Sequence, residues 1–326
     1  MFRYGHLVAL ATALVVPSAA TFNASAQDFP SKPIRIIVAF APGGVADTGA
    51  RAITDKLSAR LGQQVSVENR PGASGNIGAQ MVAQSPPDGY TLLLAFDGTM
   101  VINPHVFPKM PIDTVNDFAY VTKLGDATLI LVAHPSVPAN NFQELLALSK
   151  KKPGTLSFGT SGTASTPHIT GEFIKLRTGL DMAHVPYKGG GQALIDVVGG
   201  QIPLVFTAIA GANQYVKQGR IRGIAIPSAK RDPALPDVPT FAESGAPGIE
   251  AYSWIGIAAP AKTPKPIVDR LQREIAAVLN EPDIRQRYAV LGIIPSGNTP
   301  EAYTEQVRAD LIKWGAVVKQ AGVKME

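Results

Sequence analysis

Short apolar runs alternate with glycine-rich turns and helical segments along most of this 326-residue chain, and this alternation limits the folds open to it. Ile34–Val38 is a β-branched run, Ala41–Gly44 breaks it, and a helix follows with Ile53, Leu57 and Leu61 on one stripe. Such runs are typical of strands buried on both faces, and their alternation with helices is typical of βαβ units. The pattern predicts an α/β fold with a parallel sheet.

The pattern starts a second time near residue 129. Further strands are expected at Val65–Val67, Thr91–Phe96, Leu129–Ala133, Leu156–Phe158, Ile202–Phe206, Ile221–Ile226 and Trp254–Ala259. Three helices are expected to close the chain, beginning near Pro266, at Pro282 and after Thr299, because proline favours the first helical turn and threonine the N-cap. We therefore expect two α/β units followed by a helical tail.

The N-terminus has the layout of a secretory signal peptide. Arg3 precedes the apolar run Leu7–Val16, Pro17 breaks that run, and Ala24–Ala26 provides a small-residue cleavage site. The run is too short to span a bilayer as a helix, which a permanent anchor would require. The sequence predicts a leader over residues 1–26, cleavage before Gln27, and a periplasmic protein.

Composition excludes several classes of function. The 30 Lys and Arg against 25 Asp and Glu give a net charge of +5 with no basic block, so nucleic-acid binding is not expected. The chain has no cysteine, which excludes disulfide scaffolds and cysteine-based metal centres or nucleophiles. Its five histidines lack metal-ligand spacing, and no nucleotide fingerprint is present. We expect no metal, no cofactor and no catalytic residue.

Two loops between a strand and a helix are candidates for ligand binding. The first is Pro42–Asp47 and the second is Gly159–His168, which is rich in serine and threonine. Helix N-termini offer free N–H groups that suit an anion, glycine lets the backbone come close, and hydroxyl groups add donors. The alternatives are a tight turn with a helix cap at the first loop, or a hydrolase triad of Ser161 or Ser165 with His168 and Asp47.

Several short motifs occur along the chain in the same order as in a known protein family. They are Pro30-Ser31-Lys32-Pro33-Ile34, Pro42-Gly43-Gly44-x-x-Asp47, Val67 to Gly78, Pro87 to Leu92, Val185 to Gly189, Pro236 to Thr240, and Trp254 with Ala259-Pro260. The mature chain resembles Bug-type receptors, the periplasmic substrate-binding components of tripartite tricarboxylate transporters. The resemblance implies a type II periplasmic-binding-protein fold, with two α/β lobes joined by two crossing strands. Lobe 1 would comprise residues 27–128 and 255–326, and lobe 2 residues 129–254.

The resemblance also implies a small carboxylate ligand, held between the lobes by backbone N–H groups, hydroxyls and water. The residues that match the ligand loops are Pro42, Gly43, Gly44, Val45 and Asp47 in the first, and Thr160, Ser161, Thr163, Ser165 and His168 in the second. Ala164 stands where the family commonly has a second glycine. Thr207 and Ala208 are expected to line the cleft, and Phe96, Asp97, Gly98 and Thr99 to face the distal part of the ligand.

The implied partners are membrane subunits of a transporter, and the protein itself is expected to be a monomer. Two other functions remain open from the sequence: a receptor that feeds a signalling sensor, and a periplasmic hydrolase.

Overall fold

The computed structural model describes residues 29–187 and 189–324. The predicted leader therefore lies outside the described residues. The strands are β1 (Ile34–Val38), β2 (Val65–Asn69), β3 (Thr91–Phe96), β4 (Phe118–Ala133), β5 (Ser157–Thr160), β6 (Ala183–Pro186), β7 (Leu204–Ala208), β8 (Arg222–Ala225), β9 (Tyr252–Pro260) and β10 (Ile293–Pro295). The helices are α1 (Val45–Leu61), α2 (Asn76–Ala83), α3 (Asn103–Val106), α4 (Phe142–Lys151), α5 (Thr166–Thr178), α6 (Gly190–Val198), α7 (Ile209–Lys217), α8 (Lys265–Leu279), α9 (Pro282–Val290) and α10 (Pro300–Ala321).

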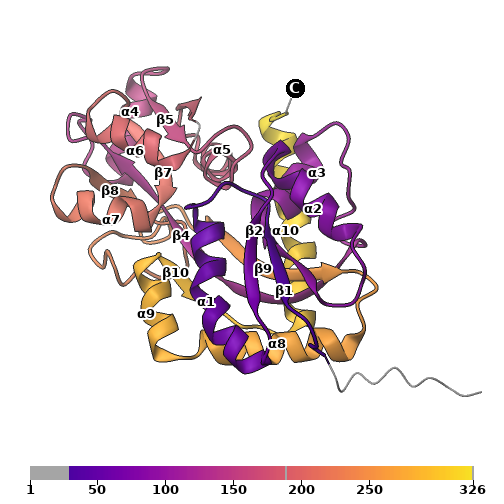
Figure 1. Cartoon of the computed structure of the whole chain (residues 1–326). Helices are drawn as coiled ribbons and strands as arrows, with labels where there is room; N and C mark the ends of the chain where they lie inside the picture. The colour runs from indigo at the N-terminus through magenta and orange to yellow at the C-terminus, as the bar shows by residue number, and fades with distance from the viewer. Residues whose placement is uncertain (1–28, 188, 325–326) are drawn as a thin grey trace, which may run out of the picture.

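The sheet is mixed: the predicted parallel pairing is found within two groups of strands, and the strands between the groups are antiparallel. Neighbouring strands follow the order β2-β1-β3-β9-β4-β7-β5-β6, with β8 and β10 also paired to β4 (Figure 1). The pairs β2–β1–β3 and β7–β5–β6 are parallel, whereas β9 and β4 run antiparallel to their neighbours. The antiparallel strands are the two segments that carry the chain between the two parallel groups.

The strand β4 is much longer than expected, since its predicted part was only Leu129–Ala133. It pairs with β9 over Phe118–Thr128, with β7 over Leu129–Ala133 and with β8 over Leu131–Ala133. Its first part has Thr122, Lys123 and Asp126 among the apolar residues. These polar residues interrupt the apolar run by which a buried strand is predicted from sequence. The partners of β4 thus change between Thr128 and Leu129.

Apolar side chains cover both faces of each parallel group. Ile36 and Ile37 show this for β1: Ile36 packs with α1 and α8 on one face, and Ile37 packs with α2 and α10 on the other. In the second group, α4 and α5 cover one face, and α6 and α7 cover the other. The expected helix ends are confirmed at Gly62, which ends α1 in the left-handed region, and at Thr299, whose hydroxyl accepts the Ala302 N–H.

Helix α5 packs against the second parallel group on one side and against β9 and α10 on the other. Gly171 lies so close to the Phe158 ring that a Cβ atom there would be 2.3 Å from it. On its other side, Ile169 belongs to the same apolar core as Trp254 and Trp314. The helix and the loop before it are therefore held at the junction of the two groups. None of the helices in the described part of the chain has the length and apolar character to cross a membrane.

Candidate functional site

The first predicted ligand loop joins the end of β1 to the start of α1. Pro42, Gly43 and Gly44 are exposed, and Val45 begins the helix. Gly43 has a φ of +90°, which favours glycine, and Gly44 occupies the N-cap position with no side-chain cap. A Cβ atom at either glycine would meet no other atom within 4 Å. The N–H groups of the first turn have no partner within the helix, so those at this glycine-lined end can donate to an anion.

Asp47 lies beneath this loop and holds its shape. It is 3% exposed, and its carboxylate accepts hydrogen bonds from the Gly43 N–H at 3.0 Å, the Arg51 Nε at 3.0 Å and the Asn69 amide at 2.9 Å. Burial alone would raise the pKa of Asp47, but these hydrogen bonds together hold the pKa below its usual value. The structure thus gives Asp47 a supporting role, and its contact with a ligand stays a prediction.

Two hydroxyl groups of the second loop form hydrogen bonds within the protein. Thr160 ends β5 and is buried, with its hydroxyl 2.7 Å from His184 Nε2. Ser165 is the N-cap of α5: its hydroxyl accepts the His168 N–H at 3.4 Å and donates to the Gly162 carbonyl at 2.7 Å. These groups fix the path of the loop.

The tip of the second loop is where a ligand could make contact. Ser161 is half-buried and Thr163 is exposed, so hydroxyl donors lie at the surface there. Ala164 has a φ of +60°, in the left-handed region that favours glycine, and its methyl group is buried in the apolar core that contains Trp254. The methyl group therefore points into the protein and away from the loop surface.

A stacked pair of histidines supports this loop from below. The rings of His168 and His184 lie 3.6 Å apart at an angle of 12°. His168 Nδ1 accepts the Ala164 N–H at 3.0 Å, so it is not placed to take a proton from a serine. Burial, the neighbouring imidazole and Lys175 lower the pKa of His168 to about 3, and burial and Lys175 lower that of His184 to about 4. Both rings are neutral at physiological pH, and the geometry does not support the hydrolase triad.

We predict that His168→Ala lowers the free energy of unfolding by about 2–3 kcal/mol, because it leaves the buried Ala164 N–H without an acceptor and removes the stack. In the unfolded chain both histidines have a pKa near 6.5, whereas in the folded protein their pKa values are lower. The stability that the pair contributes is therefore lost as pH falls from about 6.5 towards 4. Thermal unfolding across this range should show a shallower acid decline in the variant. An equal decline in both proteins would contradict the assignment.

The strand end at Thr207 and Ala208 lies beside the second loop. A Cβ atom on Gly190 would be 3.2 Å from the Thr207 hydroxyl and 3.9 Å from the Ser161 side chain. Gly190 begins α6, and its contact with Thr207 and Ser161 was missed in the sequence. The signal that could have found it is the run of three glycines, residues 189–191, immediately before a helix.

Phe96 and Thr99 lie on the side of the first loop. Phe96 ends β3 and its ring meets that of Phe40 edge-on at 5.1 Å. Thr99 is buried, and its hydroxyl donates to the Ser74 carbonyl at 2.9 Å. Phe96 is half-buried and retains some exposed surface. Thr99 is buried, and its hydrogen bond stabilises the turn at Ser74.

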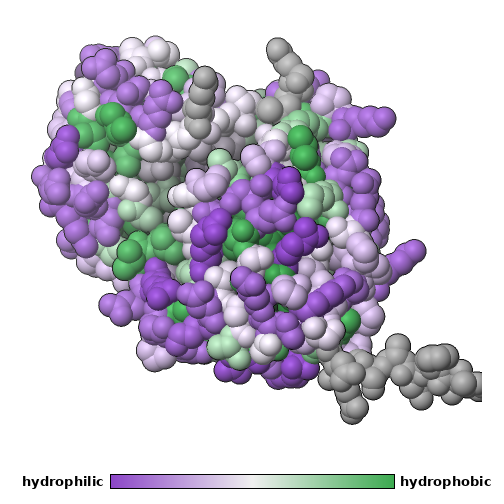
Figure 2. Space-filling model, in the orientation of Figure 1, coloured by the Kyte–Doolittle hydropathy of each residue, from purple (hydrophilic) through white to green (hydrophobic). Residues whose placement is uncertain are grey.

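The predicted residues thus form two sets. The first loop, Phe96 and Thr99 gather at the carboxyl ends of β1 and β3, and the second loop, Thr207 and Ala208 gather at the carboxyl ends of β5 and β7. Figure 2 shows a hollow between the part that carries β5–β8 and the part that carries α1. The hydrogen bond from Thr166 to Asp97 at 2.8 Å joins the two sets at one side.

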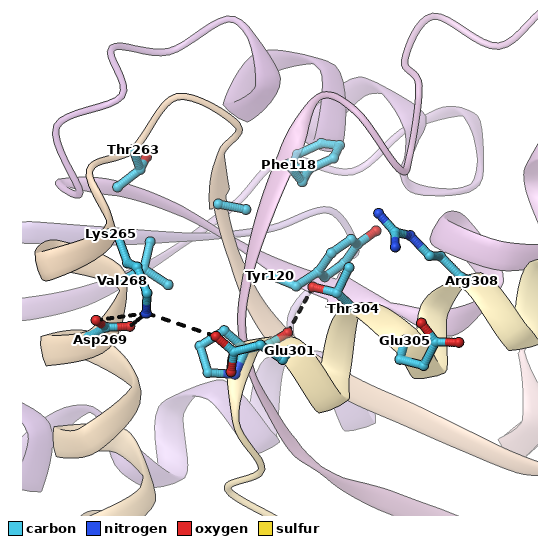
Figure 3. Close-up of a pocket in the computed structure, with 12 residues that line it drawn as sticks. Phe118, Tyr120, Thr263, Lys265, Val268, Asp269, Glu301, Thr304, Glu305 and Arg308 are labelled. Carbon is cyan, nitrogen blue, oxygen red and sulfur yellow. Dashed lines mark hydrogen bonds and ion pairs between the residues drawn. The ribbon is translucent and has the colours of Figure 1, made fainter.

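A separate cavity of about 480 Å³ lies away from these loops, between α8, α10 and the start of β4 (Figure 3). The single Lys265 in its wall bonds to Asp269 at 2.7 Å and lies 3.9 Å from Glu301 (Figure 3). Its wall also contains Arg308 and Glu305, so two cations stand against three carboxylates, and this charge balance does not favour an anion.

Comparison with known proteins gives one consistent result. The sequence model of the family described as "Tripartite tricarboxylate transporter family receptor" matches residues 49–323. The protein BugT of Bordetella pertussis (strain Tohama I) is 34% identical over 303 residues, covering 93% of each chain.

Solved structures share the whole fold. The periplasmic binding protein BugD aligns with a TM-score of 0.78 at 33% identity, covering 91% of this chain and 100% of BugD. Rpa4515 of R. palustris, solved with adipate, aligns with a TM-score of 0.82 at 34% identity, covering 91% of this chain and 99% of that one. These likenesses confirm the predicted periplasmic-binding-protein fold.

Proposed function

Because this chain belongs to the tripartite tricarboxylate transporter receptor family, we propose that it captures a small carboxylate between its first and second loops and delivers it to the membrane subunits of such a transporter. As a member of this family it is a periplasmic solute-binding protein and not an enzyme. The leader over residues 1–26, with cleavage before Gln27, belongs to the same proposal, as does the monomeric state.

The observation that supports this proposal is the chemistry of the two loops. The open N-terminus of α1 offers backbone N–H groups, and Ser161, Thr163 and Thr207 offer hydroxyls from the other side. Neutral donors of this kind can hold an anion firmly once water is excluded, because their hydrogen bonds to a charged acceptor are strong in a low-dielectric site. The adipate in the related Rpa4515 is consistent with this class of ligand.

Capture would follow from closure of two lobes, with lobe 1 made of residues 27–128 and 255–326 and lobe 2 of residues 129–254. The change in the partners of β4 between Thr128 and Leu129 supports the first of these boundaries. A ligand favours the closed state only by the difference between its affinities for the closed and open states. A carboxylate that touches both loops meets this condition, since it gains the second set of donors only on closure.

The test is thermal unfolding of the purified protein with a panel of organic acids that includes adipate, malate and benzoate. A carboxylate that binds the folded protein alone, present at 100 times its dissociation constant, stabilises it by about 2.7 kcal/mol, and the melting temperature rises accordingly. Matching alcohols and amides serve as uncharged controls. If no acid of the panel shifts the transition or gives a heat of binding, the proposal fails.

A further inference from the structure

Asp97 was expected to face the distal part of the ligand, but its carboxyl group is fully buried, so it cannot contact a ligand directly. It is 0% exposed, and it accepts hydrogen bonds from the Thr166 hydroxyl at 2.8 Å, the Ser253 hydroxyl at 3.1 Å and the Gly98 N–H. Thr166 begins α5, Ser253 lies on β9, and Gly98 opens a π-helical turn, a geometry that often occurs at functional sites. The carboxyl group therefore ties the end of β3 to α5 and β9.

The surroundings of Asp97 provide no compensating charge. In the described part of the chain, no Lys, Arg or His forms an ion pair with it, and the polar side chains that hold it are neutral hydroxyls. Asp310 and Tyr303 on α10 are the titratable groups that interact with it electrostatically, and Lys313 on the same helix acts on Asp310. Helix α5 carries His168, Glu172 and Lys175. Among these, Asp310 disfavours the charged form, the histidine is neutral, and Glu172 is paired with Lys175 at 2.9 Å.

Burial raises the pKa of Asp97 to about 7, with a further increase from Asp310, against the lowering effect of its hydroxyl and N–H donors. The group is therefore divided between its charged and neutral forms near neutral pH. Both forms of the carboxyl group can keep their hydrogen bonds without a structural change, since a hydroxyl group can accept a hydrogen bond as well as donate one.

The carboxyl group is also next to the site. It follows Phe96 in the chain, and its partner Thr166 follows Ser165, so it lies between residues assigned to the two sets. Like charges interact strongly across a buried region, and a second negative charge nearby favours the neutral form of a carboxyl group.

We propose that Asp97 takes up a proton from solvent when a carboxylate enters the site, so that ligand capture is coupled to protonation of this buried group. The inference rests on the proposed carboxylate-binding function. Coupling between two sites is reciprocal, so a ligand that favours protonation must itself bind more tightly when the proton is present. Capture therefore strengthens as pH falls through neutrality, although the acid itself stays fully ionised.

The experiment is calorimetric titration of the purified protein with adipate at about pH 6.5 and about pH 8.5, where both carboxyl groups of adipate are ionised. We expect the dissociation constant to be about sixfold higher at the upper pH, as a rise of about one unit in a pKa near 7 requires. Near neutral pH, titration in buffers of different ionisation enthalpy should show net proton uptake per adipate bound.

Asp97→Asn keeps the shape and the acceptor for Thr166 but cannot titrate, so its affinity should vary by less than about twofold over the same range. Asp310→Asn, the same change at a neighbouring carboxyl group that accepts the Trp254 N–H at 2.8 Å, should keep the proton uptake but move its midpoint to lower pH, because the charge of Asp310 raises the pKa of Asp97. Thr166→Val removes one donor to the charged form, so it should move the midpoint of the pH response to higher pH, and it serves if Asp97→Asn does not fold.

A wild type that binds adipate with the same pH response as Asp97→Asn, or with no proton uptake, would overturn this inference and leave the carboxylate-receptor function intact. A wild type that binds none of the acids in the panel at either pH would overturn both.

Discussion

Replacing Gly44 by leucine is expected to weaken carboxylate binding by at least about 100-fold while leaving the protein folded, a loss of about 2.8 kcal/mol in binding free energy. Gly44 caps α1 with a φ of −76°, which any residue adopts, and a Cβ atom there would meet nothing within 4 Å. The leucine side chain would instead occupy the space in front of the helix N–H groups. Titration with the acid that gives the largest thermal shift measures the loss.

The fold should tolerate this change. Leucine is a poorer N-cap than glycine, so the free energy of unfolding should fall by no more than about 1 kcal/mol. Ala59→Leu, at an exposed position near the other end of the same helix, is the matched control and should bind as the wild type does. Unchanged affinity in Gly44→Leu would show that the first loop is only a turn between β1 and α1.

Replacing Asp47 by alanine is expected to reduce both stability and binding. The change leaves the Gly43 N–H, Arg51 and Asn69 without their shared acceptor, which should lower the free energy of unfolding by about 2–4 kcal/mol. The loop would lose the bond that holds Gly43 in place, so carboxylate affinity should fall even at temperatures where the variant is folded. Denaturant unfolding and titration at a low temperature measure the two effects separately.

The pH dependence gives a second check on Asp47. Because its pKa is lower in the folded state than in the unfolded state, its contribution is present above the unfolded value and is lost as pH falls through the folded value. Wild-type and Asp47→Ala stabilities should therefore converge in acid. Asp55→Ala, on the exposed face of the same helix, is the control and should change stability by less than about 0.5 kcal/mol. A stability loss in Asp47→Ala that persists unchanged in acid would contradict the role given to the carboxylate.

The sequence predicted most of the individual elements because their signals are local. The β-branched run at Ile34–Val38, the glycine at residue 62 and the Thr299–Pro300 pair each act through neighbouring atoms, and each is found where it was expected. The direction of β4 and β9 depends on which strands they join, and periodicity contains no information on this. The short strand β6 was missed because Ala183–Pro186 is only partly buried and contains a proline.

The candidate site was predictable in its backbone and less so in its side chains. Glycine before a helix predicts an open N-terminus, and Gly43 and Gly44 provide one. Polar side chains in the same loops can also form hydrogen bonds to the backbone of the loop, because its buried N–H and C=O groups need partners. Asp47, Ser165 and His168 bond to the backbone of their own loops, and only the folded arrangement distinguishes that use from contact with a ligand.

A crystal structure of the protein grown with adipate tests the central claim most directly. The account predicts one adipate carboxylate between the N–H groups at the start of α1 and the hydroxyls of Ser161 and Thr163, with the two lobes closed around it. Adipate found instead in the cavity beside Lys265, or bound to one loop with the lobes apart, would contradict it.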